Sequence, residues 1–149
     1  MANEGNGALT MPMFVLKGYG YSPEHFKQMR EVPLQLNKDE FIVFLNSIAD
    51  KYPFMVVIGL RVLTEKTVKE ILAQKKIDFN EKTYSLSGLM SKLCNKKVIS
   101  EGMCDSLKDL LELENRAVHG CEISVDIARW ALNTIPDTLN DLHRVANQI

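Results

Sequence analysis

A helical spacing of apolar residues through most of the chain after residue 36 is the feature that most limits the fold of this sequence. Apolar residues three or four positions apart share one face of an α-helix, whereas strands show alternating apolar and polar residues. The clearest stripe consists of Ala128, Leu132, Ile135, Leu139, Leu142 and Ala146. No alternation long enough for a sheet is present. We therefore predict an all-α fold, an antiparallel bundle of about five helices around one core.

Capping residues and prolines divide this pattern into segments. Asparagine and serine favour helix N-termini because their side chains accept hydrogen bonds from free backbone N–H groups, and glycine favours C-termini. The expected segments are 38–51 after Asn37, 53–74 with Pro53 in its first turn, a short helix after Ser85, a helix from Ser100 to Gly120 and a final helix after Ser124. Pro136 lies inside the final helix, and we expect it to kink or split that helix because proline has no backbone N–H.

The first 36 residues show no sustained helical period and contain several glycines and prolines. We therefore predict two parts, an irregular N-terminal segment over residues 1–36 and a helical bundle over residues 37–149. The stretch Met11–Leu16 is apolar, so we expect it to lie extended on the bundle or on a partner.

The net charge is close to neutral but unevenly distributed. A formal net charge of −1 argues against a protein that binds nucleic acid through its overall charge. Between Glu65 and Lys97, however, there are eight lysines against four acidic residues. This excess indicates either an ordinary solvated helix surface or a basic face for RNA or an acidic partner. Lys92, Lys96 and Lys97 are the candidate nucleic-acid-binding residues of such a face.

Hydropathy and cysteine content indicate a cytoplasmic protein with no membrane partner. No apolar run approaches the roughly 20 residues that span a bilayer, and the start of the chain lacks the layout of a signal peptide. Cys94, Cys104 and Cys121 form no CxxC pair and are odd in number, so we expect reduced thiols. His119 and Cys121 could be metal ligands, but a closed zinc site needs about four, so we expect no metal and no cofactor.

The segment Leu110–Gly120 carries the most specific signal in the sequence. It reads Leu-Leu-Glu-Leu-Glu-Asn-Arg-Ala-Val-His-Gly. With the Leu60–Leu63 stretch upstream and the short Leu86–Leu93 segment, it resembles the signature helix of the HEPN superfamily, and the resemblance covers the chain from Asn37 onward. The resemblance implies a helical bundle, often dimeric, and in many members a metal-independent ribonuclease whose active site pairs an arginine with a histidine.

Carried over to this sequence, the resemblance makes His119 the histidine, but it finds no arginine at the expected positions. Those positions hold Glu112, Leu113 and Glu114, and the nearest arginine, Arg116, lies three residues before His119. One implied function is a non-catalytic or degenerate interaction or RNA-binding module in a prokaryotic defence, toxin–antitoxin or RNA-processing system. The alternative is a metal-independent endoribonuclease that uses His119 and Arg116 at a dimer cleft.

The resemblance also implies partners and a candidate catalytic set. The implied assembly is a homodimer, with RNA or a protein as a further partner. His119, Arg116 and Asn115 form the candidate catalytic set, in which Asn115 is the polar residue usual within the motif. Trp130 adjoins the apolar stripe of the last helix, which indicates a core or dimer-interface residue.

Helical geometry separates the polar residues around the motif. At about 100° per residue, Glu114 falls in the apolar stripe, whereas Glu112, Arg116 and His119 lie near the opposite side. A buried carboxylate is costly unless it is paired, and Arg61 occupies the inward stripe of the 53–74 helix. We therefore predict a structural ion pair between Arg61 and Glu114. For the exposed residues the alternatives are an ordinary helix surface, phosphate binding by Arg116, or catalysis in which His119 moves protons.

Overall fold

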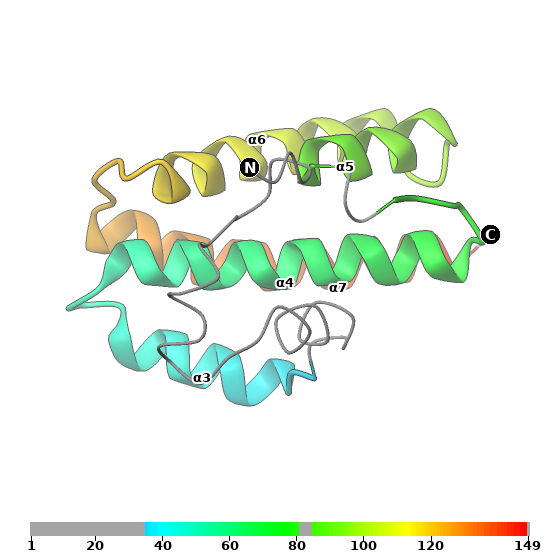
Figure 1. Cartoon of the computed structure of the whole chain (residues 1–149). Helices are drawn as coiled ribbons and strands as arrows, with labels where there is room; N and C mark the ends of the chain where they lie inside the picture. Colours follow the sequence, from blue (N-terminus) through cyan, green and yellow to red (C-terminus); the bar gives the residue numbers. More distant parts are fainter. Residues whose placement is uncertain (1–34, 81–84, 149) are drawn as a thin grey trace, which may run out of the picture. The chain divides into compact units, whose positions relative to one another are not determined.

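The computed structural model describes residues 35–80 and 85–148. The expectations for residues 1–34, including the extended Met11–Leu16 segment, lie outside these ranges. The described part consists of five helices and contains no strand. The helices are α3 (Lys38–Ile48), α4 (Pro53–Gln74), α5 (Leu86–Asn95), α6 (Glu101–Val118) and α7 (Val125–Asn147). The expected all-α bundle is confirmed (Figure 1).

Helix α4 is the centre of the bundle and contacts each of the other four helices. Helices α3 and α6 run antiparallel to α4, whereas α7 lies beside α4 and runs in the same direction (Figure 1). Helices α5 and α6 pack against each other and against α4, so they form a hairpin on one side of the central helix. This arrangement leaves the outer face of α6 open to solvent.

Helix α3 approaches α4 closely at Gly59. A Cβ atom at this position would lie 2.7 Å from Cδ2 of Leu45 and 3.1 Å from Cζ of Phe41. A glycine inside a helix costs about 1 kcal/mol relative to alanine, so its presence needs a reason. Here the reason is the space that the side chains of α3 occupy.

The N-terminal caps expected from the sequence are present. The side chains of Asn37, Ser85, Ser100 and Ser124 accept hydrogen bonds from backbone N–H groups in the first turns of α3, α5, α6 and α7. Pro53 begins α4, as expected. Helix α3 is shorter than predicted, because the N–H of Lys51 bonds to the carbonyl of Ile48 and closes a turn there.

Pro136 does not split the last helix. Helix α7 runs without interruption from Val125 to Asn147 and contains Pro136. Ile135 and Leu139, before and after the proline, are both fully buried. Burial of both halves of the stripe against one core holds the helix together although proline removes one backbone hydrogen bond.

Three helices end in the same kind of backbone turn. The residue after each helix cap has a positive φ, with values of 54° at Lys76, 55° at Lys97 and 80° at Gly120. After α6, the N–H of Cys121 donates to the carbonyl of Arg116 at 2.9 Å and the N–H of Gly120 donates to Ala117 at 3.1 Å. This Schellman motif satisfies carbonyls that the helix end leaves free. It also fixes the path of the chain just after α6.

The turn at Gly120 predicts a specific cost of substitution. We expect Gly120→Ala to lower the free energy of unfolding by about 1 kcal/mol, because L-residues are strained at positive φ. No atom lies within 4 Å of the Cβ that the substitution would add, so the cost comes from the backbone alone. Gly102→Ala in α6 is the matched control, since its Cβ also meets nothing within 4 Å and its φ is not positive. Urea unfolding that gave the same destabilisation for both variants would contradict this account.

The prediction of three reduced thiols is wrong for two of the cysteines. Cys94 at the end of α5 and Cys104 at the start of α6 form a disulfide, with a Cα–Cα distance of 6.0 Å. The turn between the two helices brings them within the range that a disulfide requires. Cys121 is a free, exposed thiol. Because cytosolic thiols are usually kept reduced, the cytoplasmic location inferred from the sequence stays a prediction.

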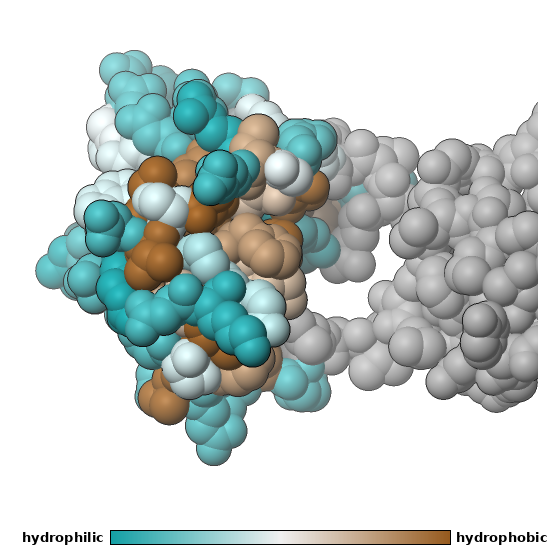
Figure 2. Space-filling view, turned by 90° about the vertical axis from the view of Figure 1, so that its left-hand side faces the viewer, coloured by the Kyte–Doolittle hydropathy of each residue, from teal (hydrophilic) through white to brown (hydrophobic). Residues whose placement is uncertain are grey.

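Most large apolar side chains of the described residues are buried, but one end of the bundle exposes several. Figure 2 shows apolar surface on the end where α4 and α7 begin and α6 ends. We call the exposed apolar residues there the end cluster: Tyr52, Phe54, Met55, Val118, Ile127 and Trp130. Trp130 is 52% exposed, so it is not a core residue.

No helix in the described ranges combines the length and the apolar composition that a membrane span requires.

Candidate functional site on helix α6

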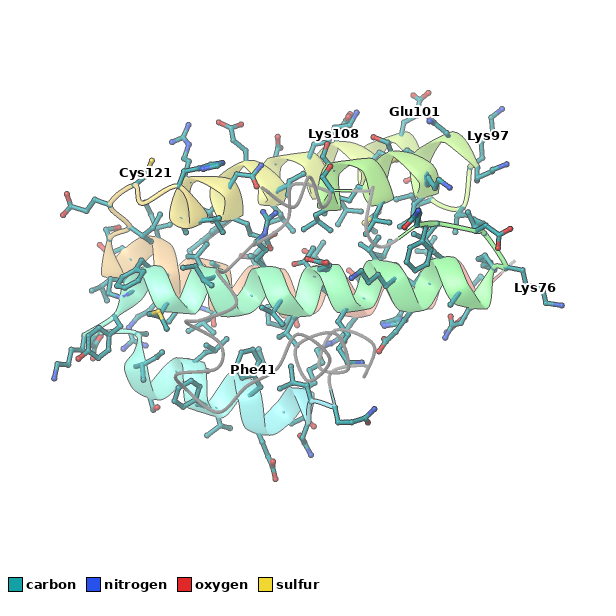
Figure 3. All side chains as sticks on the ribbon, viewed as in Figure 1. Phe41, Lys76, Lys97, Glu101, Lys108 and Cys121 are labelled. Carbon is teal, nitrogen blue, oxygen red and sulfur yellow. A yellow bond between two sulfur atoms is a disulfide. The ribbon has the colours of Figure 1, made fainter. Side chains whose placement is uncertain are left out.

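The outer face of α6 borders an open pocket of about 410 Å³. Its lining comes from the first turn of α5, the part of α6 from Lys108 onward and the turn that follows α6. The lining residues are Ser87, Lys108, Leu111, Glu112, Asn115, Arg116, His119 and Cys121. In Figure 3, Lys108 and Cys121 mark the span of this face along α6. The three candidate catalytic residues, Asn115, Arg116 and His119, therefore line one pocket.

The charged residues of the pocket are exposed and partly paired. Glu112 and Arg116 form an ion pair between Oε1 and a guanidinium nitrogen at 2.8 Å, one helical turn apart. Their side chains are 68% and 64% exposed, so the pair stabilises the helix only slightly. Lys108 and His119 line the same pocket from either side of this pair along α6. An anion that entered the pocket would therefore meet the side chains of Lys108, Arg116 and His119, together with the carboxylate of Glu112.

The end of α6 positions the last two residues of the site. His119 is the C-cap of the helix, and its N–H donates to the carbonyl of Asn115 at 2.9 Å. Cys121 is held by its backbone hydrogen bond to Arg116 in the Schellman turn. Gly120, with its positive φ, lets the chain turn between them. The two side chains thus enter the pocket from a turn of defined geometry.

Glu114 is buried in the core, as its place in the apolar stripe indicated. Its side chain is 0% exposed, and its Oε1 accepts a hydrogen bond from the Thr64 hydroxyl at 2.7 Å. The other oxygen, Oε2, is buried without a hydrogen-bond partner. The pKa of Glu114 is raised from 4.5 to about 7, chiefly by burial and also by nearby Glu65, while the Thr64 hydrogen bond and Arg61 oppose the rise. This carboxyl therefore titrates near neutral pH rather than in the acid range.

The predicted ion pair between Arg61 and Glu114 is not formed. The guanidinium of Arg61 donates instead to Oδ1 of Asn115, the next residue of α6. Arg61 still favours the charged form of Glu114 through space. The hydroxyl of Thr64, and not the predicted guanidinium of Arg61, donates the hydrogen bond to Glu114. A fully buried ion pair would desolvate both charges, whereas Arg61 in its observed position is only partly buried.

The three lysines proposed from the sequence do not reach the pocket. Lys96 and Lys97 follow α5 at the end of the hairpin where α6 begins, and Lys97 appears at that end in Figure 3. At about 1.5 Å per residue, the length of α6 separates them from Arg116 by roughly 22 Å. Lys92 donates a hydrogen bond to the backbone carbonyl of Asp78. These three lysines therefore lie outside the lining of the α6 pocket.

Two pocket residues were missed by the sequence analysis. Lys108 lies four residues before Glu112 and eight before Arg116, so helical spacing alone could have placed it on the same face. Ser87 comes from α5, and only the packing of α5 against α6 brings it to the pocket. Among residues 35–80 and 85–148, no group of three or more metal-ligating side chains could hold a metal ion.

Comparison with known proteins found no matching family model, no matching curated protein and no matching solved structure. The family assignment therefore rests on the Leu110–Gly120 segment of the sequence. It stays a hypothesis.

Proposed function

We propose that this domain is a HEPN-like, non-catalytic module that binds RNA through the α6 pocket. The observation that carries the proposal is that Lys108, Arg116 and His119 line one open pocket together with the amide of Asn115. Lysine and arginine side chains bind nucleic-acid phosphates, and single-stranded RNA can present its phosphates and bases to such a surface. Glu112 is the one carboxylate among the lining residues, so the balance of charge favours an anionic ligand.

A phosphate group of the ligand would replace the carboxylate of Glu112 as the partner of Arg116. An exposed ion pair of this kind contributes about 1 kcal/mol or less. Phosphate oxygens can accept two charge-assisted hydrogen bonds from one guanidinium, which is a stronger arrangement. Arg116 can therefore exchange the Glu112 carboxylate for a ligand phosphate at little cost.

Binding is favoured over cleavage by the residues that surround His119. The HEPN resemblance expects an arginine at positions 112–114, where this chain has carboxylates at Glu112 and Glu114. The nearest arginine, Arg116, lies outside those positions. A metal-independent endoribonuclease is the second candidate, because Arg116 and His119 line the same pocket. In that case Arg116 would bind the phosphate while His119 moved protons to or from the 2′-hydroxyl.

The proposal is tested by the dissociation constant of a labelled single-stranded RNA pool at fixed salt. We expect Arg116→Ala to raise this constant about tenfold, because a hydrogen bond to a charged group contributes about 1.5 kcal/mol or more. Lys108→Ala should also weaken binding, whereas Lys96→Ala is the matched control at the far end of the hairpin and should change it less than twofold. Equal effects of Lys108→Ala and Lys96→Ala would contradict binding at the pocket.

The same samples distinguish binding from cleavage. RNA recovered intact after incubation with excess protein and a metal chelator supports the binding module. RNA shortened by the wild-type protein and left intact by His119→Ala would instead establish the endoribonuclease. Absence of any RNA binding would overturn both candidates and favour a protein partner.

We also propose that two copies of the chain associate through the end cluster. An exposed group of large apolar side chains that includes a tryptophan is typical of an interaction surface. Val118, a member of the cluster, immediately precedes His119, so the cluster adjoins the pocket along the chain. A homodimer formed here would place the α6 ends of both copies near the interface. The setting inferred from the resemblance is a prokaryotic defence, toxin–antitoxin or RNA-processing system.

Association through the end cluster predicts a selective effect of charge at Trp130. We expect Trp130→Glu to weaken self-association at least tenfold, since a buried charge opposes interface formation. Val43→Glu is the matched control, because Val43 is 69% exposed on α3 and lies outside the end cluster. Mass measured by light scattering over a range of concentrations checks both variants. A wild-type protein that stays monomeric, or an equal response of the two variants, would contradict the proposed interface.

A further inference from the structure

A buried carboxyl lies directly behind the pocket wall. Glu114 is fully buried, and its Oε2 has no hydrogen-bond partner. The next residue, Asn115, lines the pocket. A buried polar atom without a partner is costly and is uncommon in folded proteins. The orphaned oxygen is therefore a place where a second arrangement of the neighbouring side chains would lower the energy.

Arg61 is the side chain that can take part in two arrangements. In the structure its guanidinium donates to Oδ1 of Asn115. It also lies near enough to Glu114 to stabilise the charged carboxylate. When Glu114 is protonated, the amide oxygen of Asn115 is the better acceptor. When Glu114 is ionised, its carboxylate competes for the same guanidinium with a full negative charge.

The remaining charges around Glu114 leave Arg61 as the group able to respond. Helix α4 contributes Glu65, which disfavours the carboxylate, and Thr64, which bonds to Oε1. The buried side chains of α5 and α7 are apolar and do not titrate. On α6 itself, Glu112 and Arg116 are exposed and paired with each other, and Lys108 and His119 line the solvent side.

We propose that Arg61 is a positioning residue for the pocket, and that the protonation state of Glu114 decides whether Arg61 holds Asn115. With Glu114 protonated, Arg61 occupies the amide oxygen, so the amide nitrogen of Asn115 is the end left to donate to a ligand. Loss of the proton to solvent draws Arg61 toward the carboxylate and frees the amide to reorient. The effect on RNA binding rests on the proposed function, whereas the exchange of partners by Arg61 does not require RNA.

The direction of the effect on ligand binding follows from the amide. A fixed N–H donor favours phosphate oxygens, whereas a free amide can present its carbonyl oxygen and repel them. We therefore expect weaker RNA binding as pH rises through neutrality, by roughly fivefold for the loss of one oriented hydrogen bond. Glu114→Gln, which cannot ionise, should keep the tighter binding at pH 8.

The deciding experiment follows the side-chain amide of Asn115 by ¹⁵N NMR between pH 5.5 and 8.5 in the protein without RNA. In the wild-type protein we expect its resonances to shift with pH, with a midpoint near the pKa of Glu114. The resonances should not shift with pH in Glu114→Gln or in Arg61→Gln. They should shift with pH in Arg61→Lys, because lysine keeps the positive charge. Resonances that do not move, or that move equally in Glu114→Gln, would overturn the inference. Because this titration needs no ligand, a failure of RNA binding would count against the proposed function alone. A pH profile of RNA affinity that is the same in wild type and Glu114→Gln would overturn the link to the pocket.

Discussion

The wild-type domain is expected to lose about 3 kcal/mol of stability between pH 4.5 and about 7, and Glu114→Gln is expected to abolish this loss. The carboxyl of Glu114 is buried with one oxygen unpartnered, so its charged form is disfavoured in the folded state. In the unfolded chain the same group is hydrated and ionises near its ordinary pKa of 4.5. The native state therefore binds this proton more tightly than the unfolded state.

The sign of the pH dependence follows from this difference in proton binding. Below pH 4.5 both states hold the proton, and Glu114 has no effect on the pH dependence of stability. Above that pH the unfolded state releases its proton first, which favours unfolding until the native group also ionises near pH 7. Stability should therefore fall across this window and level off above it.

Urea unfolding of both proteins at several pH values measures the effect. Other groups titrate in the same window, so the informative quantity is the difference between wild type and Glu114→Gln as a function of pH. Glu112→Gln is the matched control, because Glu112 lies on the same helix and is exposed. A constant difference between wild type and Glu114→Gln from pH 4.5 to 7.5 would contradict the assigned environment of Glu114.

Removing the disulfide between Cys94 and Cys104 is expected to lower the free energy of unfolding by about 3 kcal/mol. The two cysteines are ten residues apart in the sequence, and the bond between them joins α5 to α6. Cross-linking residues at this separation restricts the unfolded chain by an amount that corresponds to about 3 kcal/mol. Cys104 belongs to a core cluster with residues of α4, α5, α6 and α7, and Cys94 packs against this cluster, so the bond braces the hairpin that carries the pocket.

Unfolding in urea with and without a thiol reductant measures this contribution at constant pH. Cys121→Ser is the control variant, because Cys121 is free and should leave the response to reductant unchanged. The double variant Cys94→Ala/Cys104→Ala should be less stable and insensitive to reductant. An oxidised wild-type protein with the same unfolding midpoint as the reduced one would show that the bond does not stabilise the fold.

Local chemistry made much of the fold predictable from the sequence. Each serine or asparagine cap identified a helix start because the cap acts within one turn of its own position. The burial of Glu114 was predictable because helical spacing fixes which residues share a face. These inferences use only neighbours along the chain, which the sequence displays directly.

The remaining features depend on contacts between helices. Arg61 donates to Asn115 and not to Glu114, which was the predicted partner. Because these two residues are adjacent in α6, a small displacement of the long Arg61 side chain is enough to exchange one partner for the other. The disulfide depends on the turn at Lys97, whose positive φ no residue-type preference indicates. Continuity of α7 through Pro136 depends on burial of the residues that flank it. None of these can be obtained from periodicity alone.

The central claim, that the α6 pocket binds RNA, is tested most directly at Cys121. This residue lines the pocket and is the free thiol of a chain whose other two cysteines form the disulfide. The measurement is the rate of alkylation of Cys121 with and without saturating single-stranded RNA. We predict that RNA slows alkylation several-fold and that Arg116→Ala, at the same RNA concentration, restores most of the rate. Full reactivity of Cys121 in a sample where RNA is demonstrably bound would place the RNA elsewhere and contradict the claim.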